Sequence, residues 1–372
     1  MPADLDLFWM SRALAEAERG RGSVEPNPMV GAVVVRDGMA VGVGHHERYG
    51  GPHAEVVALA RAGGLARGST VYVTLEPCCH HGKTPPCTDA LVGAGVARVV
   101  AALRDPFPRV NGGGLARLRE AGVEVETGPG AEAARRLNAP YFKRLTTGLP
   151  YVTAKWAMTL DGKTAAASGD SRWISGPRSR ALVHEVRGRM DAILAGIGTV
   201  LADDPRLTAR PPGSRTPARV VLDGSARLPL DGHLARTARE VPVWVAVTDR
   251  APADRRLALE ALGCVVFPFP GTGRIPVGPL LAELGRRGAT NVLVEGGGTV
   301  LGTFLDAGQV DAVDVFLAPI VEGGSHAFSP AKGLGVATMA EALRLDHPEI
   351  SLVDGDVRVR GTLPRPWQVE SP

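Results

Sequence analysis

The chain has 372 residues, 44% of them hydrophobic and 22% charged, and a formal net charge of +3 at pH 7. This length and composition are typical of a globular protein with two domains, each large enough to bury a core. The charge is nearly balanced and the arginines are scattered rather than gathered into a stripe, which argues against nucleic acid as the partner.

The N-terminal stretch predicts a helix and lacks the features of a signal peptide. Leu7, Met10 and Leu14 recur at helical spacing, and acidic residues stand where a signal peptide is basic. The longest apolar runs, such as 241–247, have fewer than about ten residues, whereas a membrane helix needs roughly 20. We therefore expect a cytoplasmic protein with no membrane partner, where clustered cysteines serve metal binding or catalysis rather than disulfides.

Short β-rich runs alternate with helical stretches in the first part of the chain. The pattern predicts strands at 31–35, 40–44, 71–75 and 98–103, and helices after His53 and over 88–95. This alternation indicates an α/β fold with a parallel component. It breaks at 146–150, so we expect domains of 1–147 and 148–372.

The second part of the chain repeats the alternation. Strands are expected at 151–158, 191–196, 219–223, 241–247, 264–269, 291–298 and 311–319. Loops rich in Pro and Gly, such as 210–217, are predicted to be turns. Cys264 lies in an apolar strand and is expected in the core.

Three of the four cysteines lie within ten residues, in the stretch EPCCHHGKTPPC at 76–87. Upstream, HAEVVALA begins at His53 and has the apolar spacing of a helix, with Glu55 in its first turn. Two residues apart, His53 and Glu55 point in different directions, so one can bind a metal while the other reaches an attacking water. A loop and a helix start also favour thiolates, the form of cysteine that zinc binds.

The order HxE, then PC, then a Cys at a helix start resembles the zinc-dependent deaminase signature, in which one His and two Cys leave a fourth position for water. Generic deaminases place two residues between the cysteines, whereas eight separate Cys78 from Cys87. The alternative is a closed structural zinc site made from Cys78, Cys79 or Cys87 with His80 or His81, and it leaves HxE unexplained. His45 and His46, near a strand end, are expected at the surface or lining a pocket rather than as ligands.

The longer stretch TLEPCCHHGKTPPCTDALVGAG, with HAEVVAL and NPMVGAVVV before it, resembles the deaminase half of the bifunctional riboflavin biosynthesis enzymes, whose insert between the cysteines has this form. The resemblance implies a cytidine-deaminase-like domain in which His53, Cys78 and Cys87 hold Zn²⁺ and Glu55 is the catalytic proton carrier. Cys79 is then a bystander.

Glycines at 296–298 follow the strand NVLV and precede a helical stretch, a turn that can approach a phosphate. The pattern is not GxGxxG, so a Rossmann domain is not indicated, and neither GKT sequence has the earlier Gly of a Walker motif. An isolated triple glycine is equally compatible with a tight turn that binds nothing.

KWAMTLDGKTA, SRWISG, GIGTVLADDPRLTAR, RVVLD and VEGGG occur in the order found in the reductase half of the same enzymes, which is similar to dihydrofolate reductase in fold. The resemblance implies substrate contacts at Ser171, Arg187, Leu207, Arg210 and Glu295, with the two arginines as phosphate clamps. It implies NADPH contacts at Ala157, Trp173, Thr199, Asp203, Gly297, Gly298, Thr299, Val300, Leu301, Gly302 and Thr303.

Three residues in these stretches can each be interpreted in two ways. Trp173 either packs against the cofactor or belongs to the core. Lys155 and Asp161 either help to position substrate or form a surface ion pair.

The family resemblance thus implies a two-step enzyme acting on a small phosphorylated pyrimidine. It deaminates 2,5-diamino-6-(5-phosphoribosylamino)pyrimidin-4-one and reduces the ribosyl group to ribityl with NADPH, and we expect a homo-oligomer. One alternative is a nucleic-acid base deaminase with an accessory binding domain, but aromatic residues make up only 5% of the chain and no basic cluster flanks HAE or PCC. A noncatalytic zinc scaffold is the other, and the presence of Glu55 argues against it.

Overall fold

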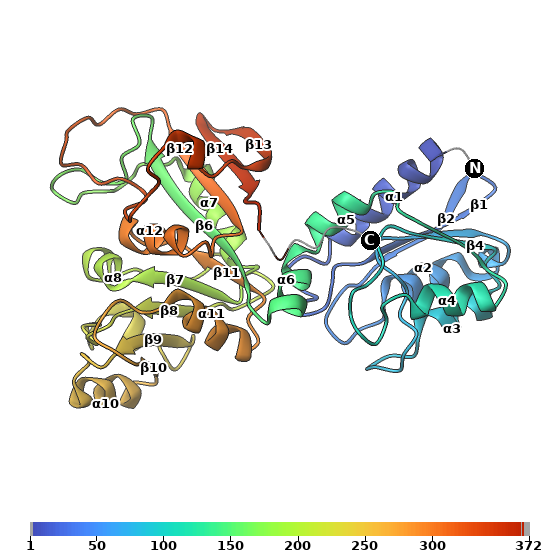
Figure 1. Cartoon of the computed structure of the whole chain (residues 1–372), viewed down its shortest axis with the longest axis horizontal. Helices are drawn as coiled ribbons and strands as arrows, with labels where there is room; N and C mark the ends of the chain where they lie inside the picture. Colours follow the sequence, from blue (N-terminus) through green and yellow to red (C-terminus); the bar gives the residue numbers. More distant parts are fainter. Residues whose placement is uncertain (1–2, 366, 368–372) are drawn as a thin grey trace. The chain divides into compact units, whose positions relative to one another are not determined.

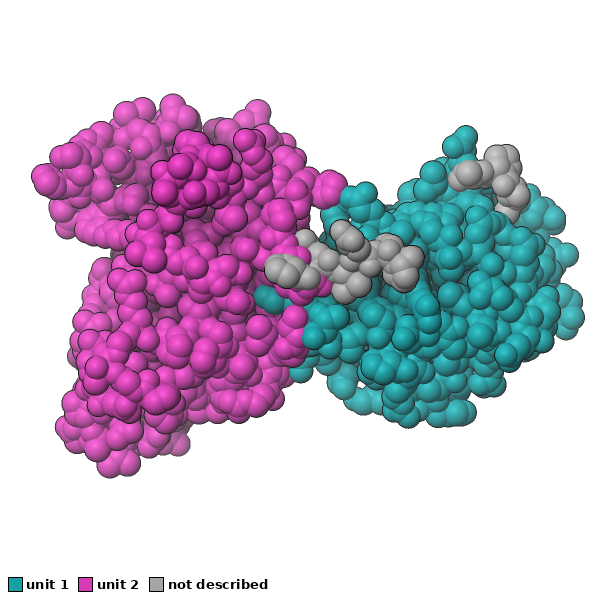
Figure 2. All heavy atoms as spheres, in the orientation of Figure 1, with its two compact units in different colours: residues 1–146 teal, residues 147–372 magenta. Residues whose placement is uncertain are grey.

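The computed structural model describes residues 3–365 and residue 367, and the chain forms two compact units, 1–146 and 147–372 (Figure 1, Figure 2). Each unit has its own sheet and its own hydrophobic core. Across the described ranges, no helix combines the length and the apolar character needed to span a bilayer.

Unit 1 is built on a five-stranded sheet with the order β2-β1-β3-β4-β5. The strands are β1 (Gly31–Arg36), β2 (Met39–His45), β3 (Thr70–Val73), β4 (Arg98–Ala101) and β5 (Glu124–Thr127). β1 runs antiparallel to both β2 and β3, whereas β3, β4 and β5 are parallel. The predicted parallel component is therefore the half of the sheet that contains β3, β4 and β5.

Helices cover both faces of this sheet (Figure 1). They are α1 (Ala3–Glu18), α2 (Ala54–Ala62), α3 (Cys87–Ala94), α4 (Gly113–Glu120), α5 (Ala131–Leu137) and α6 (Ala139–Thr147), with a short 3₁₀ turn at Gly63–Ala66. Val33 and Val35 pack with α1, while Ala32 and Val34 pack with α2, because successive strand residues point to opposite faces.

A buried ion pair fixes α1 on the sheet. The carboxylate of Asp6 accepts hydrogen bonds from the Tyr72 hydroxyl (2.6 Å) and from the Arg98 guanidinium (2.9 and 2.8 Å). Arg98 lowers the pKa of Asp6, so the carboxylate stays charged inside the protein. These contacts join residues 66 and 92 positions apart in the sequence.

Two glycines let α2 lie unusually close to β2. A Cβ atom on Gly42 would stand 2.2 Å from the carbonyl oxygen of Ala58, and one on Gly44 would stand 2.6 Å from its nitrogen. Any side chain at either position would push α2 away from the strand.

Unit 2 is built on a nine-stranded sheet with the order β10-β9-β8-β7-β11-β6-β12-β14-β13. Its strands are β6 (Tyr151–Thr159), β7 (Ala192–Gly196), β8 (Ala218–Leu222), β9 (Val243–Thr248), β10 (Val265–Phe269), β11 (Asn291–Val294), β12 (Ala312–Ala318), β13 (Asp346–Val353) and β14 (Asp356–Thr362). The strands from β10 to β12 are parallel, and β14 and β13 add an antiparallel hairpin.

Apolar clusters lie on both faces of the parallel part, as expected for strands that are apolar throughout. The helices are α7 (Pro177–Arg187), α8 (Ile197–Asp203), α9 (His233–Arg236), α10 (Ala253–Ala261), α11 (Val277–Arg286) and α12 (Gly298–Asp306), with a 3₁₀ turn at Met339–Glu341. The carboxyl ends of β6, β7 and β11 are neighbours at one edge of the sheet, the usual position of a ligand site in such folds.

The predicted strands all exist, although several are shorter than expected by one to four residues. The strand expected at 98–103 ends at Ala101, and the one expected at 291–298 ends at Val294, because Gly296 and Gly297 turn the chain into α12. Cys264 is buried, as predicted. The sequence interpretation did not anticipate the β13–β14 hairpin, whose two-residue turn of Asp354 and Gly355 has positive φ at both positions.

Candidate active sites

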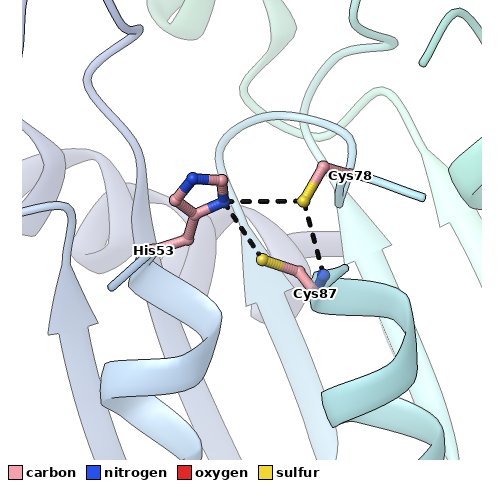
Figure 3. Close-up of side chains that lie close together, drawn as sticks. All are labelled: His53, Cys78 and Cys87. Atoms are coloured by element: carbon pink, nitrogen blue, oxygen red, sulfur yellow. Dashed lines mark hydrogen bonds between the residues drawn. The ribbon is translucent and has the colours of Figure 1, made fainter. Parts of the chain in front are cut away.

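Three side chains converge in unit 1 at the starts of two helices (Figure 3). His53 is the residue that caps α2, Cys87 is the first residue of α3, and Cys78 lies in the loop after β3. The Nδ1 atom of His53 is 3.5 Å from the Cys78 sulfur and 3.2 Å from the Cys87 sulfur. All three candidate ligand atoms lie within 4.8 Å of one another.

These spacings fit a tetrahedral zinc ion. With Zn–S bonds of about 2.3 Å and Zn–N bonds of about 2.1 Å, tetrahedral geometry separates nitrogen from sulfur by about 3.5 Å. One imidazole and two sulfurs are also a donor set that suits zinc. Three protein ligands leave the fourth position available to a water molecule.

The local electrostatics favour a thiolate. A hydrogen bond with the Cys87 thiol lowers the pKa of Cys78, and His53 lowers it further. The backbone N–H of Cys87, at the start of α3, also donates to the Cys78 sulfur (3.4 Å). The hydrogen bond between the two thiols, together with burial, raises the pKa of Cys87, so Cys78 is the member of the pair that is prepared to bind a cation as a thiolate.

Glu55 lies one residue beyond the start of α2 and is 3% exposed. Burial raises the pKa of its carboxyl to about 7, with the positive field of His53 opposing the shift. Its Oε2 atom has no hydrogen-bond partner among the described residues. A buried carboxylate with one oxygen available has the properties of a proton carrier.

A second buried carboxylate, that of Glu76, holds the loop between β3 and Cys78 in place. Glu76 accepts backbone hydrogen bonds from Asp105 (3.1 Å), Gly112 (2.9 Å), Gly114 (2.9 Å) and Leu115 (3.2 Å). Sequence reasoning did not single out Glu76, although its position directly before PC was visible.

His46 lies beside the three ligands rather than at the surface. It is 2% exposed and His45 is 8% exposed, so of the two places expected for these residues, the surface and the lining of a pocket, the surface was wrong. The Nδ1–H of His46 donates to the carbonyl oxygen of Pro52 (2.9 Å), which leaves Nε2 to accept from the Asn27 amide (3.2 Å). Its ring meets the His53 ring edge-on, with centroids 5.2 Å apart.

The alternative of a closed structural site does not match the geometry. The Cys79 thiol points to the carbonyl oxygen of Arg109 (3.7 Å), and the His80 ring packs against Phe107. Within residues 3–365 and 367, His53, Cys78 and Cys87 are the one group of three or more such side chains close enough to share a metal ion.

A second cluster lies in unit 2 around the end of β11. Arg187, the last residue of α7, forms a two-pronged ion pair with Glu295, which directly follows β11. The Nε–Oε1 distance is 2.7 Å, and both side chains are largely buried. Arg187 also donates to the carbonyl oxygen of Thr208 (3.3 Å).

Other charged groups surround this pair. Arg210 donates to the Thr208 hydroxyl (2.9 Å) and lies 3.4 Å from Nε2 of His184. Burial lowers the pKa of Lys155 on β6, while the nearby Glu295 opposes that shift. The structure thus brings together the predicted Arg187, Arg210 and Glu295 and adds His184, which sequence reasoning missed because a helical His has no distinguishing local signal.

The predicted cofactor positions form a neighbouring group. Gly297 caps α12 with φ of +64°, and a Cβ atom there would lie 3.0 Å from the Thr199 hydroxyl on α8. A Cβ atom on Gly196 would stand 2.7 Å from Val300. The turn into α12 therefore lies directly beside α8.

Trp173 is 68% exposed, so the core interpretation was wrong. The Arg180 guanidinium lies 4.5 Å from the centre of its ring. Arg172 donates to the carbonyl oxygen of Asp203 (3.1 Å), which brings this loop to the end of α8.

The remaining predicted residues make fewer contacts that point to a ligand. Ala157 lies on β6 and Ser171 in the loop after it, and no hydrogen bond among the described residues joins either one to the Arg187–Glu295 pair. Leu207 is 4% exposed with φ of +50°, so mainly its backbone is available to a ligand. Asp161 accepts from the Thr159 hydroxyl (2.7 Å) and from the backbone of Gly323 (2.8 Å), which joins the loops after β6 and β12.

Comparisons with known proteins identify a domain in each unit. The cytidine and deoxycytidylate deaminase zinc-binding region matches residues 4–103, and the RibD C-terminal domain matches residues 150–358. The chain is 42% identical to the riboflavin biosynthesis protein RibD of Escherichia coli, over 95% of this chain and 98% of that one. It is 41% identical to RibD of Bacillus amyloliquefaciens, over 95% of each chain.

Solved structures of similar proteins cover both units of the chain. RibD of Acinetobacter baumannii superposes with a TM-score of 0.84 at 39% identity, covering 98% of this chain and all of that one. A Thermotoga maritima protein described as a diaminohydroxyphosphoribosylaminopyrimidine deaminase/5-amino-6-(5-phosphoribosylamino)uracil reductase gives a TM-score of 0.83 at 35% identity, with the same coverage.

The expected fold class is confirmed, with a cytidine-deaminase-like zinc-binding domain followed by a RibD reductase domain. Because one family model covers more than half of the chain and full-length relatives are about 40% identical, the chain belongs to the RibD family of bifunctional deaminase/reductase enzymes.

Proposed function

We propose that this chain catalyses two steps of riboflavin biosynthesis. Residues 1–147 hydrolytically deaminate 2,5-diamino-6-(5-phosphoribosylamino)pyrimidin-4-one, and residues 148–372 reduce the ribosyl side chain to ribityl with NADPH. The observation that carries this proposal is the convergence of His53, Cys78 and Cys87 beside the buried carboxylate of Glu55. The Thermotoga maritima relative, 35% identical, is described by the same two activities.

In the deaminase, His53 would hold Zn²⁺ through Nδ1, and Cys78 and Cys87 would hold it through their sulfurs. When bound, the ion would lower the pKa of a water molecule to about 7, so that hydroxide would be available at neutral pH. Glu55 would carry one proton of the attacking water to the ring nitrogen and the other to the departing amine, which leaves as ammonia while the water oxygen becomes the carbonyl oxygen. His46, fixed by Asn27 and Pro52, packs against the His53 ring and keeps its orientation.

In the reductase, NADPH supplies a hydride to the anomeric carbon of the opened sugar. Gly297, Gly298 and the start of α12 offer backbone N–H groups to the cofactor phosphates, with Thr199 beside them. The exposed ring of Trp173 would pack against the cofactor, and Ala157, Asp203 and residues 299–303 would also contact it.

The two proposed substrate arginines have different roles. Arg187 is neutralised by Glu295, so it chiefly holds that carboxylate at the site. Arg210 is exposed and has no carboxylate partner among its contacts, so it is the principal clamp for the 5′-phosphate. Ser171 and the backbone of Leu207 complete the substrate contacts.

We further propose a homo-oligomer in the cytoplasm. The cytoplasmic location rests on the use of clustered cysteines as thiol ligands. The oligomer rests on β13, which ends the nine-stranded sheet and exposes Ile350 (71%) and Leu352 (80%). An exposed apolar edge strand invites pairing with a second copy.

Zinc content tests the proposed ligand set. Purified protein should contain one zinc ion per chain, and Cys78→Ser or Cys87→Ser should remove it because each takes away one of only three ligands. Cys79→Ser is the matched control and should keep the metal, since its thiol points to Arg109. Elemental analysis by mass spectrometry measures the content, and loss of zinc from Cys79→Ser alone would refute the assignment.

Replacing the proton carrier should separate the two activities. Glu55→Gln should lower ammonia release by about 100- to 10,000-fold, the usual contribution of a general acid–base group. Zinc content and NADPH oxidation with the already deaminated compound should stay at the wild-type level. If both activities disappear from a folded variant, the division of labour is wrong, and if excess RNA suppresses ammonia release, the nucleic-acid alternative gains support.

The phosphate clamp can be tested with two substrates. Arg210→Ala should raise the KM for the phosphorylated compound in the reductase step by about tenfold, because a charge-assisted hydrogen bond is lost. Turnover of the dephosphorylated compound and deamination should not change. Arg274→Ala, an exposed arginine after the edge strand β10, serves as the control. An equal loss with both compounds would contradict a phosphate contact.

The oligomer can be measured by light scattering coupled to gel filtration. The wild-type protein should have at least twice the mass of one chain. The double variant Ile350→Glu and Leu352→Glu should shift it toward the monomer, because two charges replace the apolar edge. A wild-type mass equal to one chain would rule out the proposal.

A further inference from the structure

Helix α7 is capped by a carboxylate from a distant part of unit 2. Asp356, the first residue of β14, is 4% exposed. Its Oδ2 atom accepts the backbone N–H of Gly176 (2.8 Å) and the hydroxyl of Ser179 (2.5 Å). Gly176 caps α7 but has no side chain to satisfy the helix start, so Asp356 supplies the missing anion.

The capping carboxylate stands on a rigid support. Asp356 pairs with Val353 and closes the two-residue turn of the β13–β14 hairpin. β14 is hydrogen-bonded along its length to β12, and Arg358 adds a two-pronged ion pair with Asp314 (2.7 and 2.6 Å). Because this hairpin is fixed to the sheet, Asp356 leaves the start of α7 little freedom to shift.

The helix that Asp356 caps presents residues to both parts of the proposed reductase site. In its first turn, Arg180 lies over the Trp173 ring and donates to the carbonyl oxygen of Ser175. In its last turn, His184 and Arg187 contact Thr208, and Arg187 holds Glu295. The cofactor end of the site is therefore one turn from the cap, and the substrate end is the full length of the helix away.

We propose that Asp356 is a positioning residue for the reduction step, and that it acts through α7 on the Trp173 loop. This inference rests on the proposed reductase function. Loss of the cap lets the first turn of α7 fray, because helix ends open before helix centres. Arg180 and the Trp173 loop then lose their fixed place, whereas Arg187 stays anchored by Glu295.

The effect has a direction that general destabilisation would not produce. Asp356→Asn keeps the size and one acceptor oxygen but removes the charge. We expect the KM for NADPH to rise about fivefold, while the KM for the pyrimidine substrate and kcat change less than about twofold, because a cap loss is modest and local. Deamination in the same chain should keep the wild-type rate.

The matched control is Asp354→Asn, which removes the same charge from the turn of the same hairpin. Asp354 is exposed, and Asn also tolerates its positive φ of +47°. This variant should have the NADPH affinity of the wild type. Binding of NADPH alone, followed by energy transfer from tryptophan to the nicotinamide, provides a readout independent of turnover.

Failure of the proposed reductase function and failure of the positioning role of Asp356 give different results. If the wild-type protein does not oxidise NADPH with the deaminated substrate, the proposed function fails. If the wild-type protein does oxidise NADPH, two results overturn the positioning role. One is that Asp356→Asn and Asp354→Asn have the same NADPH affinity. The other is that Asp356→Asn lowers only kcat, because fewer molecules fold. Should Asp356→Asn not fold, Ser179→Ala removes one of the two contacts and should raise the NADPH KM about twofold; an unchanged value overturns the role as well.

Discussion

The close contact between α2 and β2 is the constraint on which the deaminase centre depends. Gly42 and Gly44 leave no side chain between the strand and the helix, so the backbone of Ala58 rests almost directly on β2. This contact fixes the start of α2, where His53 and Glu55 are found. Two glycines that contact neither side chain therefore determine where the proposed metal ligand and the proposed proton carrier lie.

Both sites use the same feature of α/β architecture, the meeting of strand ends with helix starts. In unit 1 the start of α3 supplies an N–H group that favours a thiolate on Cys78. In unit 2 the turn at Gly297 opens the start of α12 toward α8. The start of α3 is therefore suited to the proposed metal site, and the start of α12 is suited to bind phosphate.

Features within short stretches of sequence were predictable. The strands, the fold class and the helices that begin near residues 53, 88 and 298 follow from local periodicity and from glycine and proline positions. The three residues that converge in Figure 3 were also named in advance, because their motifs resemble those of a known family.

Contacts between remote segments were not predictable. The Arg187–Glu295 pair spans 108 positions and the Asp356–Ser179 contact spans 177, and no periodicity encodes such pairings. Burial of individual polar residues was equally hidden, which is why His46 was expected at the surface or lining a pocket. The Asp354–Gly355 turn could have been predicted, because Asp-Gly between runs of alternating hydrophobic and polar residues is a strong hairpin signal.

The mutual neutralisation of Arg187 and Glu295 constrains how this enzyme could be redesigned. Removing either partner leaves the other as an uncompensated charge in a buried place, a change that commonly costs about 3–5 kcal/mol of folding free energy. Directed evolution toward new sugars would thus have to exchange both positions at once, a step that single-nucleotide libraries rarely sample. Arg210 is a better position to mutate first. It is exposed, so replacing it leaves no buried charge without a partner.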